Sequence, residues 1–242
     1  MRLAWLILLA IWLGVAARSA SADSAEGTAA FLRGDHAAAV DLWRPPAEAG
    51  DADAQYGLGW CHHFGMGAPQ DFASAIHWYG KAARQNHANA QYAMGALTET
   101  GQGVRKNLTA ALDWYRKAAR FAPHGEAEYA AGRLLFRGLG VARDEQAALD
   151  YFSAAAAQGH PAAQYVLGAA YEAGWGVPED LVTAYYWFSL ATRAGMPALR
   201  PYDPTYDAEA ALGRVRKRLP DYEVKRAEDR VAAAPAATLR RR

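Results

Sequence analysis

The sequence predicts an all-α protein built as an α/α solenoid, a stack of repeated helix-turn-helix units. Three observations carry this prediction. A Gly-x-Gly tripeptide recurs at steps of 36, 37 and 36 residues, further positions recur in the same phase, and apolar residues between them keep helical spacing. A single helical pair cannot bury both of its apolar faces, so we expect neighbouring repeats to share a core. The tripeptides begin at Gly65, Gly101, Gly138 and Gly174.

Four further positions of the repeat keep the same steps, which chance does not produce. They hold a glycine, a tyrosine, a second aromatic residue and an alanine. These four columns are Gly59, Gly95, Gly132 and Gly168; Tyr56, Tyr92, Tyr129 and Tyr165; Trp78, Trp114, Tyr151 and Trp187; and Ala82, Ala118, Ala155 and Ala191.

Each repeat is predicted to hold two helices. In the second repeat the first helix covers residues 88–99, with Tyr92, Gly95 and Ala96 on one side. Gly-x-Gly ends this helix because glycine readily adopts the left-handed conformation that closes a helix. The second helix follows a residue suited to N-capping and carries an aromatic pair near its middle. The capping column is Asp71, Asn107, Asp144 and Asp180, and the tryptophans expected in second-helix core columns are Trp43, Trp78, Trp114 and Trp187.

These patterns resemble the Sel1-like repeat, a relative of the tetratricopeptide repeat. The resemblance rests on Ala-Gln-Tyr-x-x-Gly, then Gly-x-Gly-Val, Asp, and Ala-x-x-Trp-Tyr-x-Lys-Ala-Ala, with the best copies at 90–119 and 163–191. It implies a right-handed superhelix that serves as a binding scaffold. We expect a degenerate N-terminal capping repeat at 23–53, whose second helix Pro45-Pro46 breaks early. The four repeats are expected at about 54–89, 90–126, 127–162 and 163–195.

The N-terminus has the pattern of a secretory signal peptide over residues 1–22. A short basic start precedes an apolar run of about 13 residues, and Ala20-Ser21-Ala22 is a small-x-small cleavage site. The alternative is an uncleaved membrane anchor, for which the run is shorter than the roughly 20 residues that a spanning helix needs. We therefore expect cleavage after Ala22 and a periplasmic or secreted protein that does not span the membrane.

The C-terminal part is predicted to form a helical cap at 196–234, followed by a basic disordered tail at 235–242. Pro204 and Pro220 suit the first positions of two helices, at about 205–218 and 220–233. From Leu212 onward the formal charge is +6, whereas residues 23–211 carry −7. Three interpretations of the basic end stay open: a solvated cap, weak contact with an anionic surface, or contact with the acidic body. The tail arginines concerned are Arg240, Arg241 and Arg242.

The motifs that organise exported hydrolases and nucleotide sites are absent from the sequence. It contains no Ser-x-x-Lys, His-Glu-x-x-His, Gly-x-Ser-x-Gly or Walker loop. His87, His124 and His160 share one repeat column, but stacked helices lie roughly 10 Å apart, too far to share a zinc ion, so we expect caps and turns. Cys61, the single cysteine, is expected to be buried. We therefore expect a protein that is not an enzyme and holds neither a metal nor a cofactor.

Aromatic and arginine side chains on the first helices and one loop tip are the candidate site, because interfaces favour these residue types. First helices line the concave face in related solenoids; the alternative is packing between repeats. The formal net charge of +1 gives no reason to expect nucleic-acid binding. From the scaffold resemblance and these surface residues, we expect a protein or peptide partner in the cell envelope and an adaptor or regulatory role. The candidates are Trp60, His63, Phe64, Arg133, Phe136, Arg137 and Trp175.

Two other functions stay open. A binder of cell-wall glycan or muropeptide would use Trp60 and Trp175 as stacking surfaces. A β-lactamase-like hydrolase is suggested by some cysteine-rich Sel1-like proteins, but the lone Cys61 and the missing Ser-x-x-Lys disfavour it.

Overall fold

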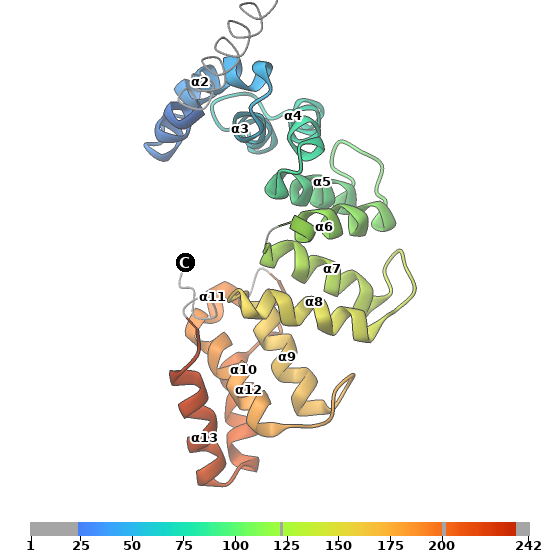
Figure 1. Cartoon of the computed structure of the whole chain (residues 1–242), viewed down its shortest axis with the longest axis vertical. Coiled ribbons are helices and arrows are strands. Elements are labelled where there is room, and N and C mark those ends of the chain that lie inside the picture. Colours follow the sequence, from blue (N-terminus) through green and yellow to red (C-terminus); the bar gives the residue numbers. More distant parts are fainter. Residues whose placement is uncertain (1–23, 122, 200–201, 236–242) are drawn as a thin grey trace, which may run out of the picture. The chain divides into compact units, whose positions relative to one another are not determined.

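The computed structural model describes residues 24–121, 123–199 and 202–235, and every regular element in these ranges is a helix (Figure 1). The chain divides into two compact units, residues 1–118 and 119–242, with the division inside α6 (Leu108–Phe121). Within each unit, the helices of the repeats pack on their neighbours in the chain. The predicted all-α repeat solenoid is thus confirmed. The predicted signal peptide at 1–22 and residues 236–242 of the predicted tail lie outside the described residues.

The first unit starts with a helical segment at 24–32, and each later helix packs on the next. The predicted break at Pro45-Pro46 is wrong, because α2 continues through both prolines. Proline φ is compatible with a helix, and the last turn is closed by the backbone N–H groups of Gly50 and Asp51, which donate to carbonyls one turn earlier. The helices are α2 (His36–Ala49), α3 (Ala52–Phe64), α4 (Phe72–Arg84) and α5 (Ala88–Thr100).

The second unit continues the repeat and ends with α12 and α13, which both pack on α10. Helix α12 begins later than predicted, four residues after Pro204. The reason is that the Asp207 side chain accepts a hydrogen bond from the Ala210 N–H and so supplies the cap. Pro220 is the N-cap residue of α13 rather than its first helical residue. The helices are α7 (Gly125–Arg137), α8 (Glu145–Ala157), α9 (Pro161–Ala173), α10 (Leu181–Ala194), α11 (Met196–Leu199), α12 (Ala208–Arg218) and α13 (Asp221–Ala232).

The predicted caps are confirmed in both columns. Each second helix begins after an aspartate or asparagine whose side-chain oxygen accepts from a backbone N–H of the first turn. The histidine column caps the first helices through the imidazole Nδ1, which accepts from a backbone N–H at 3.1–3.2 Å. The first glycines of the Gly-x-Gly tripeptides are left-handed C-caps. The capped pairs are Asp71 with Ala73, Asn107 with Ala110, Asp144 with Ala147, Asp180 with Thr183, His87 with Ala90, His124 with Ala127, and His160 with Ala163.

Trp43 of α2 is buried as predicted, but in α4, α6 and α10 the core aromatic is one residue later than predicted. Trp78, Trp114 and Trp187 are only half-buried, and lysine ammonium groups lie 4.6 and 4.3 Å from the ring centroids of the first two. The following residues are buried instead, and each packs flat against a glycine of the first helix. A Cβ atom on that glycine would lie 2.5–2.8 Å from the ring. The pairs are Gly59 with Tyr79, Gly95 with Tyr115, Gly132 with Phe152 and Gly168 with Phe188; Trp43 is the buried counterpart in α2.

The second glycine of the tripeptide brings three of the loops against the second helix of the preceding repeat. A Cβ atom on Gly67 would lie 2.2 Å from the His36 carbonyl oxygen, and one on Gly103 would lie 2.5 Å from the Phe72 Cβ. Gly176 makes the same kind of contact in the second unit. Because all three also have φ near +70°, both the backbone and the close approach require glycine.

A polar column joins three of the first helices, α3, α5 and α9, to the helix before them. The side-chain amides of Gln55, Gln91 and Gln164 donate to carbonyls of α2, α4 and α8 at 2.9, 3.0 and 3.3 Å. Glu128 occupies this column in α7, where it accepts from the Gln158 amide. Burial raises the pKa of Glu128, so this carboxylate is less well solvated than an exposed one.

Candidate partner-binding site

Three of the seven predicted site residues form one aromatic cluster on the last turns of α3. Trp60, His63 and Phe64 lie on one side of the helix, since residues three and four apart are neighbours. The ring centroids of Trp60 and Phe64 are 4.4 Å apart, and those of His63 and Phe64 are 4.1 Å apart in a stacked arrangement. Trp60 is 37% exposed and Phe64 is 49% exposed. Large apolar side chains gathered on the surface in this way are typical of interaction sites.

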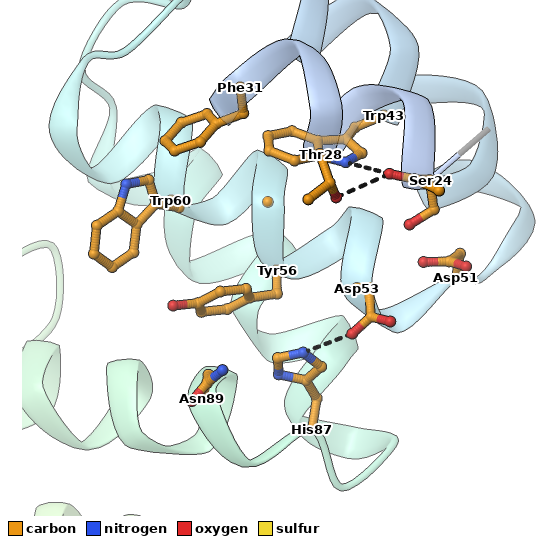
Figure 2. Close-up of a pocket in the computed structure, with 12 residues that line it drawn as sticks. Ser24, Thr28, Phe31, Trp43, Asp51, Asp53, Tyr56, Trp60, His87 and Asn89 are labelled. Carbon is orange, nitrogen blue, oxygen red and sulfur yellow. Dashed lines mark hydrogen bonds and ion pairs between the residues drawn. The ribbon is translucent and has the colours of Figure 1, made fainter. Parts of the chain in front are cut away.

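Trp60 also lines a cavity of about 710 Å³ within the first unit. We call this the first-unit cavity. Its walls come from the helical segment 24–32, from α3 and from the start of α5 (Figure 2). Phe31 and Trp60 are on one side of it in this view, and Asp51 and Asp53 are on the other. No lysine or arginine is among the residues that line it.

The N-terminal wall of the cavity is fixed to α2 through Trp43. The Trp43 indole N–H donates to the Ser24 carbonyl oxygen at 3.1 Å, and the Thr28 hydroxyl donates to the same oxygen at 3.0 Å. Gly27 and Gly57 flank the indole so closely that a Cβ atom on either would lie within 2.5–2.8 Å of it. The cavity is therefore formed by packed helices, as preformed binding sites are.

Asp53, His87 and Tyr56 form the polar side of the cavity. His87 Nδ1 accepts the Ala90 N–H, so its Nε2 carries the proton and donates to the Asp53 carboxylate at 3.1 Å. The imidazole stacks on the Tyr56 ring, with centroids 4.8 Å apart. Burial raises the pKa of Tyr56, which keeps its hydroxyl protonated. Asp53 itself is 82% exposed at its side chain and has room for a further donor.

The other four predicted residues lie in the second unit. Phe136 and Trp175 stack on each other with centroids 4.5 Å apart, and the Arg143 guanidinium lies 5.3 Å from the Phe136 ring centroid. Trp175 is half-buried by this contact rather than fully exposed at its loop tip. Arg137 is paired with Asp203 at 3.7 Å, and Arg133 is half-buried on α7. The candidates thus form two groups, one in each unit, and their role in binding stays a prediction.

Sequence reasoning missed the rest of the cavity. Phe31 and Asp51 carry no repeat signal that singles them out, and Asp53 occupies a column that varies between repeats. Tyr56 was visible as a repeated tyrosine, but its recurrence indicated packing and not a site. One sequence signal could have indicated this site. Tyr56 and His87 each belong to a column that recurs between repeats, and the two side chains stack on each other across neighbouring repeats.

The basic end is partly neutralised by acidic residues of the last repeat. Arg214 of α12 pairs with Glu172 at 3.2 Å, and Arg218 pairs with Glu179. These exposed pairs contribute little stability. They do show the basic segment in contact with acidic residues of its own unit.

The described residues contain no group of three or more His, Cys, Asp or Glu side chains that could hold a metal ion. No helix in the ranges that the structure covers is long and apolar enough to cross a membrane. Cys61 is fully buried, as expected, and burial raises its pKa to about 11, so its thiol is unreactive at neutral pH.

Comparisons with known proteins agree with the repeat pattern. The family profile described as Sel1 repeat matches residues 52–87, 88–120, 125–160 and 161–196. A solved Sel1 repeat protein from Oxalobacter formigenes is 31% identical over 89% of this chain and 88% of its own, with a TM-score of 0.71. The immunity protein Pa5087 from Pseudomonas aeruginosa is 21% identical over 92% of this chain and 84% of its own, with a TM-score of 0.51, which shows a shared fold alone.

No curated protein matches the chain in sequence. The family match covers more than half of the chain, and the Oxalobacter structure extends the likeness over most of it. Sel1 repeats generally serve as non-catalytic scaffolds for protein interaction. On these grounds the chain belongs to the Sel1 repeat family.

Proposed function

We propose that this protein is an exported, non-enzymatic Sel1 repeat scaffold that binds a protein or peptide partner in the cell envelope, as an adaptor or regulator. The observation that carries the proposal is the first-unit cavity, which joins the exposed cluster of Trp60 and Phe64. Aromatic side chains that remain exposed beside a preformed cavity have the composition of interface hot spots. Sel1 repeats typically serve protein interaction, which favours a polypeptide partner.

The export part of the proposal rests on the sequence of residues 1–22, with its apolar run and cleavage site after Ala22. The proposed domain order follows the sequence: a capping repeat at 23–53, four repeats over about 54–195, a helical cap at 196–234 and a basic tail at 235–242. Packing of α12 and α13 on α10 supports a capping role for the C-terminal helices.

In-cell cross-linking followed by affinity capture and mass spectrometry tests the proposal. The bait is the full precursor, exported by its own signal. It is compared with Trp60→Ala/Phe64→Ala in the first unit and with Arg137→Ala in the second. Tyr222→Ala is the matched control, because Tyr222 is also an exposed aromatic residue (72%) but lies on α13. Circular dichroism checks that helicity is unchanged in each variant.

We expect one envelope protein to be captured by the wild type and by Tyr222→Ala, and lost with Trp60→Ala/Phe64→Ala. Loss with Arg137→Ala instead would move the site to the second unit and keep the adaptor role. If no specific protein is captured by any form, the adaptor proposal is refuted.

A glycan binder is the second candidate, because Trp60 lies across the first-unit cavity from Asp51 and Asp53. An aromatic face opposed by hydrogen-bond acceptors suits a sugar ring and its hydroxyl groups. Trp175 contributes less to this candidate, since its ring already stacks on Phe136. Tryptophan fluorescence titrated with muropeptides tests it, and no change at millimolar ligand would count against it.

A further inference from the structure

In the second unit, Tyr202 lies against residues that correspond to the polar side of the first-unit cavity. The Tyr202 hydroxyl donates to Glu126 Oε1 at 2.7 Å. Its ring lies edge-on to Tyr129, with centroids 5.1 Å apart, and 4.7 Å from the His160 ring. Tyr202 follows the last repeat and is 76 residues from Glu126 in sequence, so a segment outside the repeats occupies the first-helix side of the second unit.

The neighbours of Tyr202 hold the same segment in place. Asp203 pairs with Arg137 of α7 at 3.7 Å. Tyr206 stacks on Tyr165 of α9, with ring centroids 4.4 Å apart. Residues 202–206 therefore bind to two successive first helices through two tyrosines and one carboxylate.

The residues that receive Tyr202 have counterparts of the same kind, in a similar arrangement, in the first unit. We call this set the carboxylate–His–Tyr frame: Glu126, His160 and Tyr129 in the second unit, and Asp53, His87 and Tyr56 at the same repeat positions in the first. The carboxylate lies 3.4 Å from imidazole Nε2 in the second unit and 3.1 Å in the first. The stacked Tyr–His centroids are 4.6 and 4.8 Å apart, and both histidines cap their helix through Nδ1.

The two copies differ in what lies against them. In the second unit the frame receives Tyr202. In the first unit the same frame lines the cavity of about 710 Å³, and the Asp53 side chain is 82% exposed. We infer that the first-unit cavity binds a tyrosine side chain of the partner, with its ring against Tyr56 and His87 and its hydroxyl donating to Asp53.

Differences between the frames predict which residue follows the partner's tyrosine. Phe64 stands at the repeat position of Arg137, the residue that pairs with Asp203. Phe64 is 49% exposed and contacts Trp60, so it offers an apolar surface where the second unit offers a cation. The partner's residue after the tyrosine is therefore apolar and not acidic. This inference rests on the proposed function, because it names the chemistry of the peptide that the scaffold binds.

Fluorescence anisotropy with a designed peptide tests the inference. The probe is a labelled, C-terminally amidated peptide, Pro-Tyr-Leu-Pro-Thr, which follows residues 201–205 with leucine in place of the aspartate and holds a single tyrosine. Companion peptides carry Phe, Ala or Lys at the tyrosine, or Asp at the leucine. The protein is produced with its own leader and purified as the cell processes it. Asp53→Ala is the test variant, and Asp113→Ala, another exposed carboxylate of the first unit outside the cavity, is its control.

We expect the Tyr peptide to bind. The Phe peptide is expected to bind about tenfold more weakly, which corresponds to about 1.4 kcal/mol, because the hydrogen bond to a charged acceptor is lost. Asp53→Ala should weaken the Tyr peptide by a similar factor and leave the Phe peptide unchanged, while Asp113→Ala changes neither. The Ala peptide and the Asp-containing peptide should bind more weakly than the Tyr-Leu peptide.

Equal binding of the Tyr and Phe peptides, or tighter binding of the Lys peptide, would overturn the inference. The inference would also be overturned if the Tyr peptide does not bind at concentrations up to about 1 mM while the cross-linking experiment still captures a partner that Trp60→Ala/Phe64→Ala loses. In that case the scaffold function would stand and the tyrosine site would not. Binding of the Tyr peptide without any captured envelope protein would instead support the site and refute the adaptor role.

Discussion

A single added methyl group should distinguish the close helix contacts of this fold from ordinary helix positions. Gly95 in α5 packs flat against Tyr115 of α6, and a Cβ atom there would lie 2.6 and 2.7 Å from two ring carbons. Tyr115 is 2% exposed and its hydroxyl donates to Glu99 at 2.8 Å, so the ring has little freedom to move aside. Gly95→Ala should therefore overpack the pair, at about 2–3 kcal/mol.

The expected net effect is smaller, because alanine stabilises a helix interior by about 1 kcal/mol relative to glycine. We expect Gly95→Ala to lower the free energy of unfolding by about 1–2 kcal/mol. Gly80→Ala is the matched control in α4 of the same unit. A Cβ atom on Gly80 would meet only the end of the Arg84 side chain, at 3.6 Å. This variant should gain about 0.5–1 kcal/mol.

Urea unfolding followed by circular dichroism at 222 nm measures both variants. The comparison is made at equal m-values, since repeat proteins can lose cooperativity when one interface weakens. In a Tyr115→Leu background the smaller side chain leaves room for the methyl group, so the Gly95→Ala penalty should disappear. If Gly95→Ala and Gly80→Ala are equally stable, the proposed flat contact between the glycine and the ring is wrong.

Three further predictions concern the second unit. His160→Ala should lower the free energy of unfolding by about 1 kcal/mol, with His160→Asn recovering part of it, because His160 Nδ1 caps α9 through the Ala163 N–H; thermal unfolding of both variants checks this. Burial raises the pKa of Glu128 above its value in the unfolded chain, so the free energy of unfolding of the wild type should fall as pH rises through that pKa. Glu128→Gln should remove this pH dependence and raise the free energy of unfolding at pH 7 by about 1 kcal/mol, as measured by urea unfolding from pH 4 to 8. Tyr202→Ala removes the tyrosine that lies against the second frame but leaves Asp203 and Tyr206 in place, so a single-residue probe, N-acetyltyrosine amide, should bind at two sites instead of one in a calorimetric titration, and an unchanged stoichiometry would contradict the equivalence of the two frames.

The fold was predictable because the repeat fixes many positions at once. The capping aspartates and the left-handed glycines are local signals, set by a few consecutive residues, and the structure places them where the sequence indicated. The helical phase of the second helices is not set by a local signal. Trp114 and Tyr115 are adjacent aromatic residues, and a rotation of about 100° around the helix axis decides which of them faces the core. Tyr115 faces the core because its ring fits against Gly95 of the first helix.

The site was predictable only in part, because it depends on contacts distant in sequence. Trp60 and Phe64 stand out as unusual residues in their columns, and both are exposed. The pairing of Asp53 with His87 joins neighbouring repeats, and the hydrogen bond of Tyr202 with Glu126 spans 76 residues. Neither contact is expressed in local periodicity, and residues 202–206 lie outside the repeat pattern altogether.

The Gly-x-Gly loops bear on how a protein of this type can acquire new partners. Loops usually tolerate insertions and vary freely between relatives. Here the second glycine of the loop touches the helix of the preceding repeat, at Phe72 for Gly103 and at Leu149 for Gly176, so the loop acts as a spacer of fixed thickness. A longer or bulkier loop would separate adjacent repeats. Substitutions that change binding specificity without disturbing the stack are therefore expected in columns of the first helices that reach the surface, such as the one that holds Trp60 in the first unit and the half-buried Arg133 in the second.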